Sequence, residues 1–133
     1  MGAAMQSVPE GLEDMVLRKG LDEQARATLP LTPIAMHILL ALVDRQRHGL
    51  GIAEHIEDFT SGRLTLGPGS LYGTIKKLLV LGLVNDASSD EGEGTDPRRR
   101  YYHITPLGRR ALEIETRELA NVLDVARLKK VLR

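Results

Sequence analysis

Cysteine and tryptophan are both absent from the 133-residue chain, and aromatic residues make up only 3% of it. Without cysteine the protein has no disulfide, no thiolate nucleophile and no thiol-based redox sensor. Without tryptophan it has no ligand pocket built by stacking on indole rings. These absences exclude thiol chemistry and restrict the ligands that aromatic stacking can hold.

An excess of charge of one sign and a long apolar run are also missing. Eighteen Lys and Arg residues balance eighteen Asp and Glu residues, so DNA binding, if present, must come from local patches. No apolar run is long enough to cross a bilayer, and the N-terminus lacks the basic and apolar regions of a signal peptide. We therefore expect a cytoplasmic protein, one domain in size, with no membrane partner.

The patterns typical of enzymes are absent as well. No Ser-His-Asp order, phosphate-binding loop or paired acidic site stands out. The histidines do not occur at the spacing of metal ligands; they are His37, His48, His55 and His103. We expect no enzyme, no catalytic or metal-ligating residue and no cofactor.

Residues 67–82, GPGSLYGTIKKLLVLG, are the most informative stretch. Pro68 after Gly67 predicts a helix start, and Gly82 predicts its end. Apolar residues at helical spacing would bury one face; they are Leu71, Ile75, Leu78 and Leu79. The opposite face carries small residues near its start and cationic residues farther on, a pattern that favours close approach to a polyanion. Its residues are Gly69, Ser70, Gly73, Lys76 and Lys77. Alternatively, Gly73 is a tolerated glycine on an ordinary surface helix, at a cost of about 1 kcal/mol.

Two more helices are predicted before this stretch, over residues 32–47 and 50–59. Thr32-Pro33 is a cap followed by proline, and the helix after it is apolar on two sides, so it must be covered on two sides. Arg63–Leu66 alternates polar and apolar residues like a very short strand. Together with residues 67–82, these elements form a helix-turn-helix.

Residues 83–87 and 100–104 are predicted strands, joined by a loop over residues 88–97 that has no apolar residue. This hairpin is the wing of a winged helix, and alternation places Tyr102 and Ile104 inward and Tyr101 and His103 outward. Arginines follow the loop, where guanidinium groups could bind phosphate; they are Arg98, Arg99 and Arg100. Alternatively, they form a solvated edge that prevents strand aggregation. Acidic residues of the loop would repel phosphate and oppose deep insertion of the wing tip.

Thr105-Pro106 starts a final helix that could run about 25 residues, because no breaker follows Gly108. Its apolar stripe is too long for a small domain to cover and favours a partner helix, hence a homodimer. The alternative is packing back on the helix that begins at Thr32. Residues 1–30 form an N-terminal arm with two short helices, 9–19 and 21–27, expected to pack on a partner subunit or on the C-terminal helix. The predicted dimerisation residues are Met36, Leu40, Leu112, Leu119, Val122, Leu123 and Ala126.

From Leu31 to Leu132 the chain resembles the PadR family of bacterial winged-helix transcription factors. The order and spacing of four short pieces carry the resemblance: His48–Ile52 (HGLGI), Gly69–Tyr72 (GSLY), Gly82–Val84 (GLV) and Arg100–Thr105 (RYYHIT). The chain departs from the family where Gly67 replaces a frequent serine and Gly73 a frequent proline, and in its long N-terminal arm.

The resemblance implies a dimeric repressor whose C-terminal helix packs on the partner's N-terminal region and whose third helix reads a palindromic operator. The DNA-contacting residues expected from the resemblance and from the exposed helix face are Ser70, Tyr72, Gly73, Thr74, Lys76, Lys77, Arg98, Arg99 and Arg100. Some relatives bind flat aromatic effectors through tryptophan, which is absent here, so no effector is transferred. A cavity at the dimer interface, if present, would be lined by Met36, Leu40 and the apolar stripe of the C-terminal helix; the alternative use of these residues is core packing.

We therefore expect a mainly α fold with a small β-hairpin wing, in three parts. Residues 1–30 are the partly helical arm, residues 31–105 the winged helix-turn-helix DNA-binding domain, and residues 106–133 the dimerisation helix. The expected function is a sequence-specific DNA-binding transcriptional regulator, a repressor that binds double-stranded DNA as a homodimer. The alternative is a winged-helix protein-interaction module without DNA binding, which the balanced charge supports.

Overall fold

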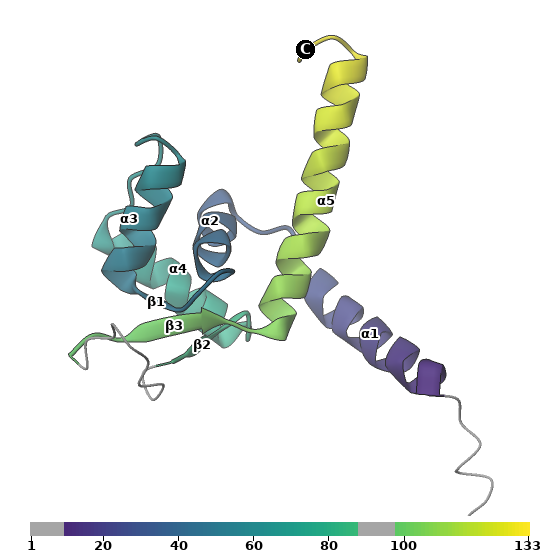
Figure 1. Cartoon of the computed structure of the whole chain (residues 1–133), viewed down its shortest axis with the longest axis horizontal. Helices are drawn as coiled ribbons and strands as arrows, with labels where there is room; N and C mark the ends of the chain where they lie inside the picture. The colour runs from purple at the N-terminus through teal and green to yellow at the C-terminus, as the bar shows by residue number, and fades with distance from the viewer. Residues whose placement is uncertain (1–9, 88–97) are drawn as a thin grey trace, which may run out of the picture.

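The structure, a computed structural model, describes residues 10–87 and 98–133. In chain order its elements are α1 (Glu10–Arg26), α2 (Pro33–Leu42), β1 (Arg47–His48), α3 (Gly49–Phe59), α4 (Pro68–Val80), β2 (Val84–Asp86), β3 (Tyr101–Ile104) and α5 (Pro106–Leu128). Helices α2, α3 and α4 gather on one side of α5 above the small sheet, while α1 leaves from the foot of α5 on the other side (Figure 1). The expected mainly helical fold with a β wing is confirmed.

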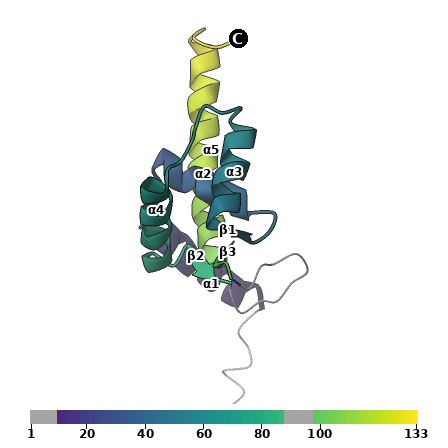
Figure 2. The same ribbon diagram turned by 90° about the vertical axis from the view of Figure 1, so that its left-hand side faces the viewer.

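The far end of α5 extends beyond the other elements in both views (Figures 1 and 2). Among residues 10–87 and 98–133, no helix is both long and apolar enough to span a membrane. The first nine residues, and the acidic loop predicted over residues 88–97, lie outside the described residues.

Helix α2 is the centre of the hydrophobic core. Its Ile38 and Leu39 are completely buried, and the helix contacts α3, α4, α5 and β3. The residues that pack around it come from each neighbouring element: Ile52, Ile56, Leu71, Ile75, Leu78, Leu83, Val84, Tyr102, Ile104 and Leu112. Burying each large apolar side chain contributes roughly 1.5–3 kcal/mol, so this core holds α4 and the wing in fixed positions.

The prediction that this central helix extends to Arg47 is wrong, because α2 ends at Leu42. Arginine side chains bind the carbonyl groups at its end: Arg47 Nε donates to Ala41 O over 2.7 Å, and Arg109 donates to Val43 O. Residues 47 and 48 therefore lie outside the helix and form β1.

The sheet is antiparallel with the order β1–β3–β2. The short strand predicted at Arg63–Leu66 is not formed, and β1 supplies the third strand instead. Leu64 and Leu66 nevertheless pack partly buried against the core. The alternation at residues 63–66 thus predicted correctly which side chains are covered, but the backbone there does not pair with another strand.

Tyr101 is buried, at 8% exposure, although alternation predicted that it points outward. Strand β3 lies in the middle of the sheet, and the Tyr101 ring meets the His48 ring of β1 edge to face, with ring centroids 5.4 Å apart. Tyr102 and Ile104 are buried as predicted. The neighbouring strand therefore covers a side chain that the hairpin alone would expose.

The wing is fixed to the start of α5. Thr105 caps α5 by accepting from the Gly108 amide over 3.0 Å, and its hydroxyl donates to Gly82 O over 2.6 Å. Gly82 has a φ of 75°, a left-handed conformation that favours glycine and ends the α4 segment. A Cβ at Gly108 would lie 3.0 Å from the carbonyl carbon of Leu83, so only glycine allows this close packing.

Helix α1 is continuous from Glu10 to Arg26, so the prediction of two short helices is wrong. A Cβ at Gly20 would meet nothing within 4 Å, so this glycine neither makes a close contact nor interrupts the helix. The helix packs on α5, the second of the two partners expected for the arm.

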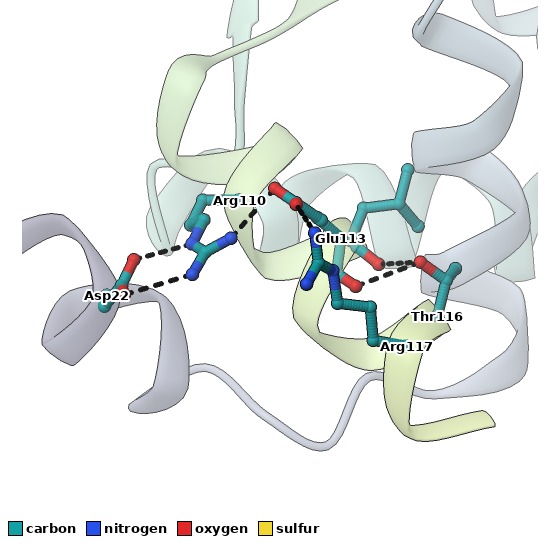
Figure 3. A network of polar contacts seen from close by, with 6 residues as sticks. Asp22, Arg110, Glu113, Thr116 and Arg117 are labelled. Atoms are coloured by element: carbon teal, nitrogen blue, oxygen red, sulfur yellow. Dashed lines mark hydrogen bonds and ion pairs between the residues drawn. The ribbon is translucent and has the colours of Figure 1, made fainter. Parts of the chain in front are cut away.

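An ion-pair network joins α1 to the first turns of α5 (Figure 3). Arg110 donates to Asp22 through Nε at 2.6 Å and Nη2 at 3.0 Å, and it contacts Glu113 at 2.9 Å. Arg117 also binds Glu113, at 2.8 Å. Hydrogen bonding by Arg110 lowers the pKa values of Asp22 and Glu113. The attachment of α1 is thus partly ionic.

Replacing Asp22 by Asn should remove part of the pH dependence of stability. The folded state lowers the Asp22 pKa below 3.8, so its stabilisation is present above that pH and is lost as pH falls through the folded value. In urea unfolding, we expect the wild type to exceed D22N in free energy of unfolding at neutral pH. The difference should shrink steadily as the solution is acidified below pH 3.8.

Asp124→Asn is the matched control, because Asp124 contacts Arg127 at 3.5 Å on the exposed side of α5. We expect D124N to follow the wild-type pH dependence. A D22N deficit that stays constant over the whole pH range would contradict the ionic attachment of α1.

Candidate nucleic-acid interface

Helix α4 has one buried face and one open face. Leu71, Ile75 and Leu78 are at most 4% exposed and pack into the core. Five of the six predicted DNA-contacting residues of the helix are exposed: Ser70, Tyr72, Gly73, Lys76 and Lys77. Thr74, the sixth, is partly covered. The helix orientation is therefore the one that the sequence pattern predicts.

The open face of α4 has no protruding side chain where it carries glycine. A Cβ at Gly69 or Gly73 would meet no atom within 4 Å, so both glycines face open space. The exposed Lys76 follows one turn after Gly73. The face can therefore lie close against a flat or grooved polyanion while lysine reaches outward.

All three predicted wing arginines are exposed. Arg100 pairs with Asp86 across the hairpin, with 3.2 Å between Nε and Oδ2. Arg99 Nη1 lies 3.0 Å from Nε2 and 3.3 Å from Nδ1 of His48. The wing arginines therefore lie next to the start of α3 as well as along the hairpin.

His48 caps the start of α3. Its Nδ1 accepts a hydrogen bond from the Gly51 amide over 2.9 Å, which satisfies one of the free amides of the first turn. Gly49 follows and is buried. A Cβ there would lie 2.7 Å from Cζ of Tyr72, so the Tyr72 ring rests directly on the Gly49 backbone.

These elements line a shallow, open pocket of about 300 Å³ between α3, α4 and the wing. Its lining residues are His48, Gly49, Leu50, Tyr72, Arg98, Arg99 and Arg100. The structure thus brings Tyr72 together with all three predicted arginines, while the other predicted residues of α4 lie outside the pocket. Sequence reasoning noted residues 48–50 only as part of the piece HGLGI that resembles the family and did not place them beside the wing arginines.

A family model described as the transcriptional regulator PadR-like family matches residues 38–114, more than half of the chain. The chain belongs to the PadR-like family of transcriptional regulators. The matched region runs from α2 into α5 and includes helix α4 and the strands of the wing. The sequence resemblance to this family is confirmed.

Two relatives match about two thirds of this PadR-like chain. An uncharacterized 37.1 kDa protein in transposon TN4556 of Streptomyces fradiae is 39% identical over 87 residues, 65% of this chain. The match spans 23% of the length of that relative. "Uncharacterized protein X" of Lysinibacillus sphaericus is 26% identical over 66% of this chain and 79% of its own length.

Solved structures have the same fold. A PadR family transcription regulator from Clostridium difficile is 23% identical, with a TM-score of 0.60 over 73% of this chain and 97% of its own. A putative transcriptional regulator from Thermoplasma acidophilum is 27% identical, with a TM-score of 0.56 over 75% of this chain and 92% of its own. Each of these two matches covers almost the whole length of the solved chain.

The predicted dimerisation residues of this PadR-like chain fall into two groups. Leu112 is 5% exposed and belongs to the chain's own core, where α5 packs on α2. Farther along α5 the stripe is open: Leu119 is 39%, Val122 62% and Leu123 45% exposed. Met36 and Ala126 are partly covered, and Leu40 is 38% exposed. Packing of α5 on its own α2 therefore accounts for the first turns only.

Histidines of the described residues do not form a metal site. No group of three or more His, Asp or Glu residues within residues 10–87 and 98–133 could hold a metal ion. His37 stacks on Phe59 with ring centroids 5.7 Å apart, and His55 meets the same ring at 5.3 Å. His48 is the helix cap described above.

We expect Gly49 and Tyr72 to be strongly coupled in stability. Gly49→Ala should destabilise the protein by about 1–3 kcal/mol, because its methyl group would push the Tyr72 ring away. Tyr72→Ala removes the obstacle, so in the double variant the alanine at position 49 should cost nothing or stabilise the helix. Urea unfolding of the four proteins measures this double-mutant cycle. Additive effects of the two substitutions would contradict the contact.

Proposed function

We propose that the protein is a sequence-specific DNA-binding transcriptional regulator, a repressor that binds a palindromic operator as a homodimer. The observation that carries the proposal is the open face of α4, which is small at Gly69 and Gly73 and cationic at Lys76 and Lys77. The three wing arginines lie beside the same helix at Tyr72. Helix α4 is held by the core on its buried face and has cations on both sides of Tyr72. These are the features expected of a helix that enters the major groove.

The residues of this surface divide into two roles. Ser70, Thr74 and Lys76 would contact base edges, since hydroxyl and ammonium groups can bond to them in the major groove. Tyr72, Lys77 and the wing arginines would contact phosphates and set the register. Gly73 would allow the helix backbone to come close to the groove. Because the whole chain is electrically neutral, this local surface would carry the DNA affinity.

The homodimer would form through the open part of α5. This 23-residue helix is about 35 Å long, and its distal half carries the exposed stripe of Leu119, Val122 and Leu123. Helix α1 exposes apolar residues that a partner's α5 could cover, among them Leu12, Met15 and Val16. Residues 1–30 and 106–133 would thus form the dimer, and residues 31–105 would bind DNA.

Dimer symmetry would place two α4 helices about 34–36 Å apart, one helical turn of DNA, which requires a palindromic site. A dimer on such a site would block a promoter without any further activity, which makes repression the simplest outcome. The proposed location is the cytoplasm. No effector is proposed.

Replacing both Lys76 and Lys77 by alanine should weaken binding to operator DNA more than to unrelated DNA, because Lys76 is assigned to base edges and Lys77 to a phosphate. Each lost phosphate contact should reduce the slope of log affinity against log salt by about 0.9. Fluorescence anisotropy with labelled duplexes at several salt concentrations measures both quantities.

The matched control for that variant is Arg18→Ala/Lys129→Ala, which also removes two exposed cations, but from α1 and the end of α5. We expect the control to keep the wild-type affinity and slope. If the lysine variant also keeps them, α4 does not face DNA, and a winged-helix protein-interaction module becomes the better explanation.

Leu119→Glu/Leu123→Glu should convert the dimer to a folded monomer, because two carboxylates would have to be buried between the helices. Sedimentation equilibrium gives the mass, and circular dichroism checks that the helices remain. Leu128→Glu is the control: Leu128 is 81% exposed and projects from the opposite side of α5. A wild-type protein that sediments as a monomer, or equal dissociation in both variants, would contradict this interface.

A further inference from the structure

We propose that Val80, at the end of α4, contacts the 5-methyl group of a thymine in each half of the palindromic site and so selects that base. This inference rests on the proposed DNA binding through the open face of α4. Val80 is 81% exposed, as much as any large apolar side chain among residues 10–87 and 98–133. Its methyl groups are therefore accessible to a partner that lies against this helix.

Val80 lies on the face of α4 that carries the glycines and the lysines. At about 100° per residue, Val80 is displaced by only about 20° from Gly73 around the helix axis. It follows Lys76 by four residues and Lys77 by three, the spacings at which helical side chains are neighbours. The open face therefore runs from small residues through two cations to one apolar side chain.

The fold keeps Val80 outside its own core. Leu71, Ile75 and Leu78 are at most 4% exposed and lie on the opposite side of α4. The residue before Val80, Leu79, is partly buried and packs against the core. A rotation of α4 that buried Val80 would expose these larger side chains, so Val80 has to make its apolar contacts with a partner.

Thymine is the base whose edge in the major groove carries a methyl group, and apolar side chains recognise it by contact. The valine side chain has two methyl groups and no hydrogen-bonding atom. Against the polar edge of another base, Val80 would displace water without replacing the hydrogen bonds that the water made. An apolar side chain on this face therefore favours thymine over the other three bases.

Helix geometry separates this contact from the others assigned to α4. Val80 is ten residues beyond Ser70, about 15 Å along the helix axis at about 1.5 Å per residue. When α4 lies along the groove, that distance corresponds to about four base pairs at about 3.4 Å each. The thymine is thus a position distinct from the base that Ser70 would contact, and it lengthens the sequence read by each helix.

The test uses duplexes that the full-length protein selects from a random-sequence library, with each thymine then replaced in turn by deoxyuridine. The replacement removes the 5-methyl group and leaves the hydrogen-bonding atoms of the base unchanged. Fluorescence anisotropy should show one position in each half-site where the replacement weakens wild-type binding about fourfold, the effect of one buried methyl group.

Val80→Ala removes both methyl groups, and the variant keeps the fold because alanine is the better helix former. At that position we expect V80A to bind the thymine and deoxyuridine duplexes equally, while other thymines that matter keep their effect. The four affinities form a double-mutant cycle between the side chain and the base methyl group.

Val131→Ala is the matched control, because Val131 is 79% exposed but lies beyond the end of α5, away from the proposed DNA surface. We expect V131A to keep the fourfold preference for thymine. A merely general effect of removing an exposed valine would appear in both variants and would count against the contact.

The outcomes separate this proposal from the proposed function. A selected consensus without thymine, no position sensitive to deoxyuridine, or equal sensitivity in V80A and the wild type would overturn the contact and leave sequence-specific DNA binding in place. Failure to select any duplex would overturn the proposed function, and the thymine contact with it.

Discussion

Burial of one face of α4 is the constraint on which the rest of the structure depends. Leu71, Ile75 and Leu78 insert into the core around α2, which fixes the rotation of α4 about its own axis. Each buried side chain contributes roughly 1.5–3 kcal/mol, more than the roughly 1 kcal/mol that a mid-helix glycine costs. The helix can therefore keep Gly73 on its open face, where a small residue permits close approach, without losing its place in the fold.

Local signals were enough to predict the elements that carry their own start and stop residues. Proline after a capping position marked α4 and α5, glycine marked the end of α4, and apolar spacing identified its buried face correctly. The missed strand β1 depends on contacts distant in sequence. Strand β1 forms because Arg47 and Arg109 bind the end of α2, and because β1 pairs with the edge of β3 opposite β2. Strand β1 in turn buries Tyr101.

The candidate site was predictable in part for the same reason. Exposure of the α4 residues followed from helical periodicity, and the arginine run was visible as charge. The contacts of Tyr72 with Gly49 and of Arg99 with His48 join segments far apart in the chain, and no sequence pattern predicts them. The chain, neutral overall, thereby places three arginines where α3, α4 and the wing meet.

The central claim is that two copies of α4 read an inverted repeat, and selection of duplexes from a random-sequence library tests it most directly. After several rounds of binding and amplification, the account predicts one consensus with two inverted half-sites whose centres are about one helical turn apart. Isolated half-sites, or a selected pool with no consensus at all, would contradict it.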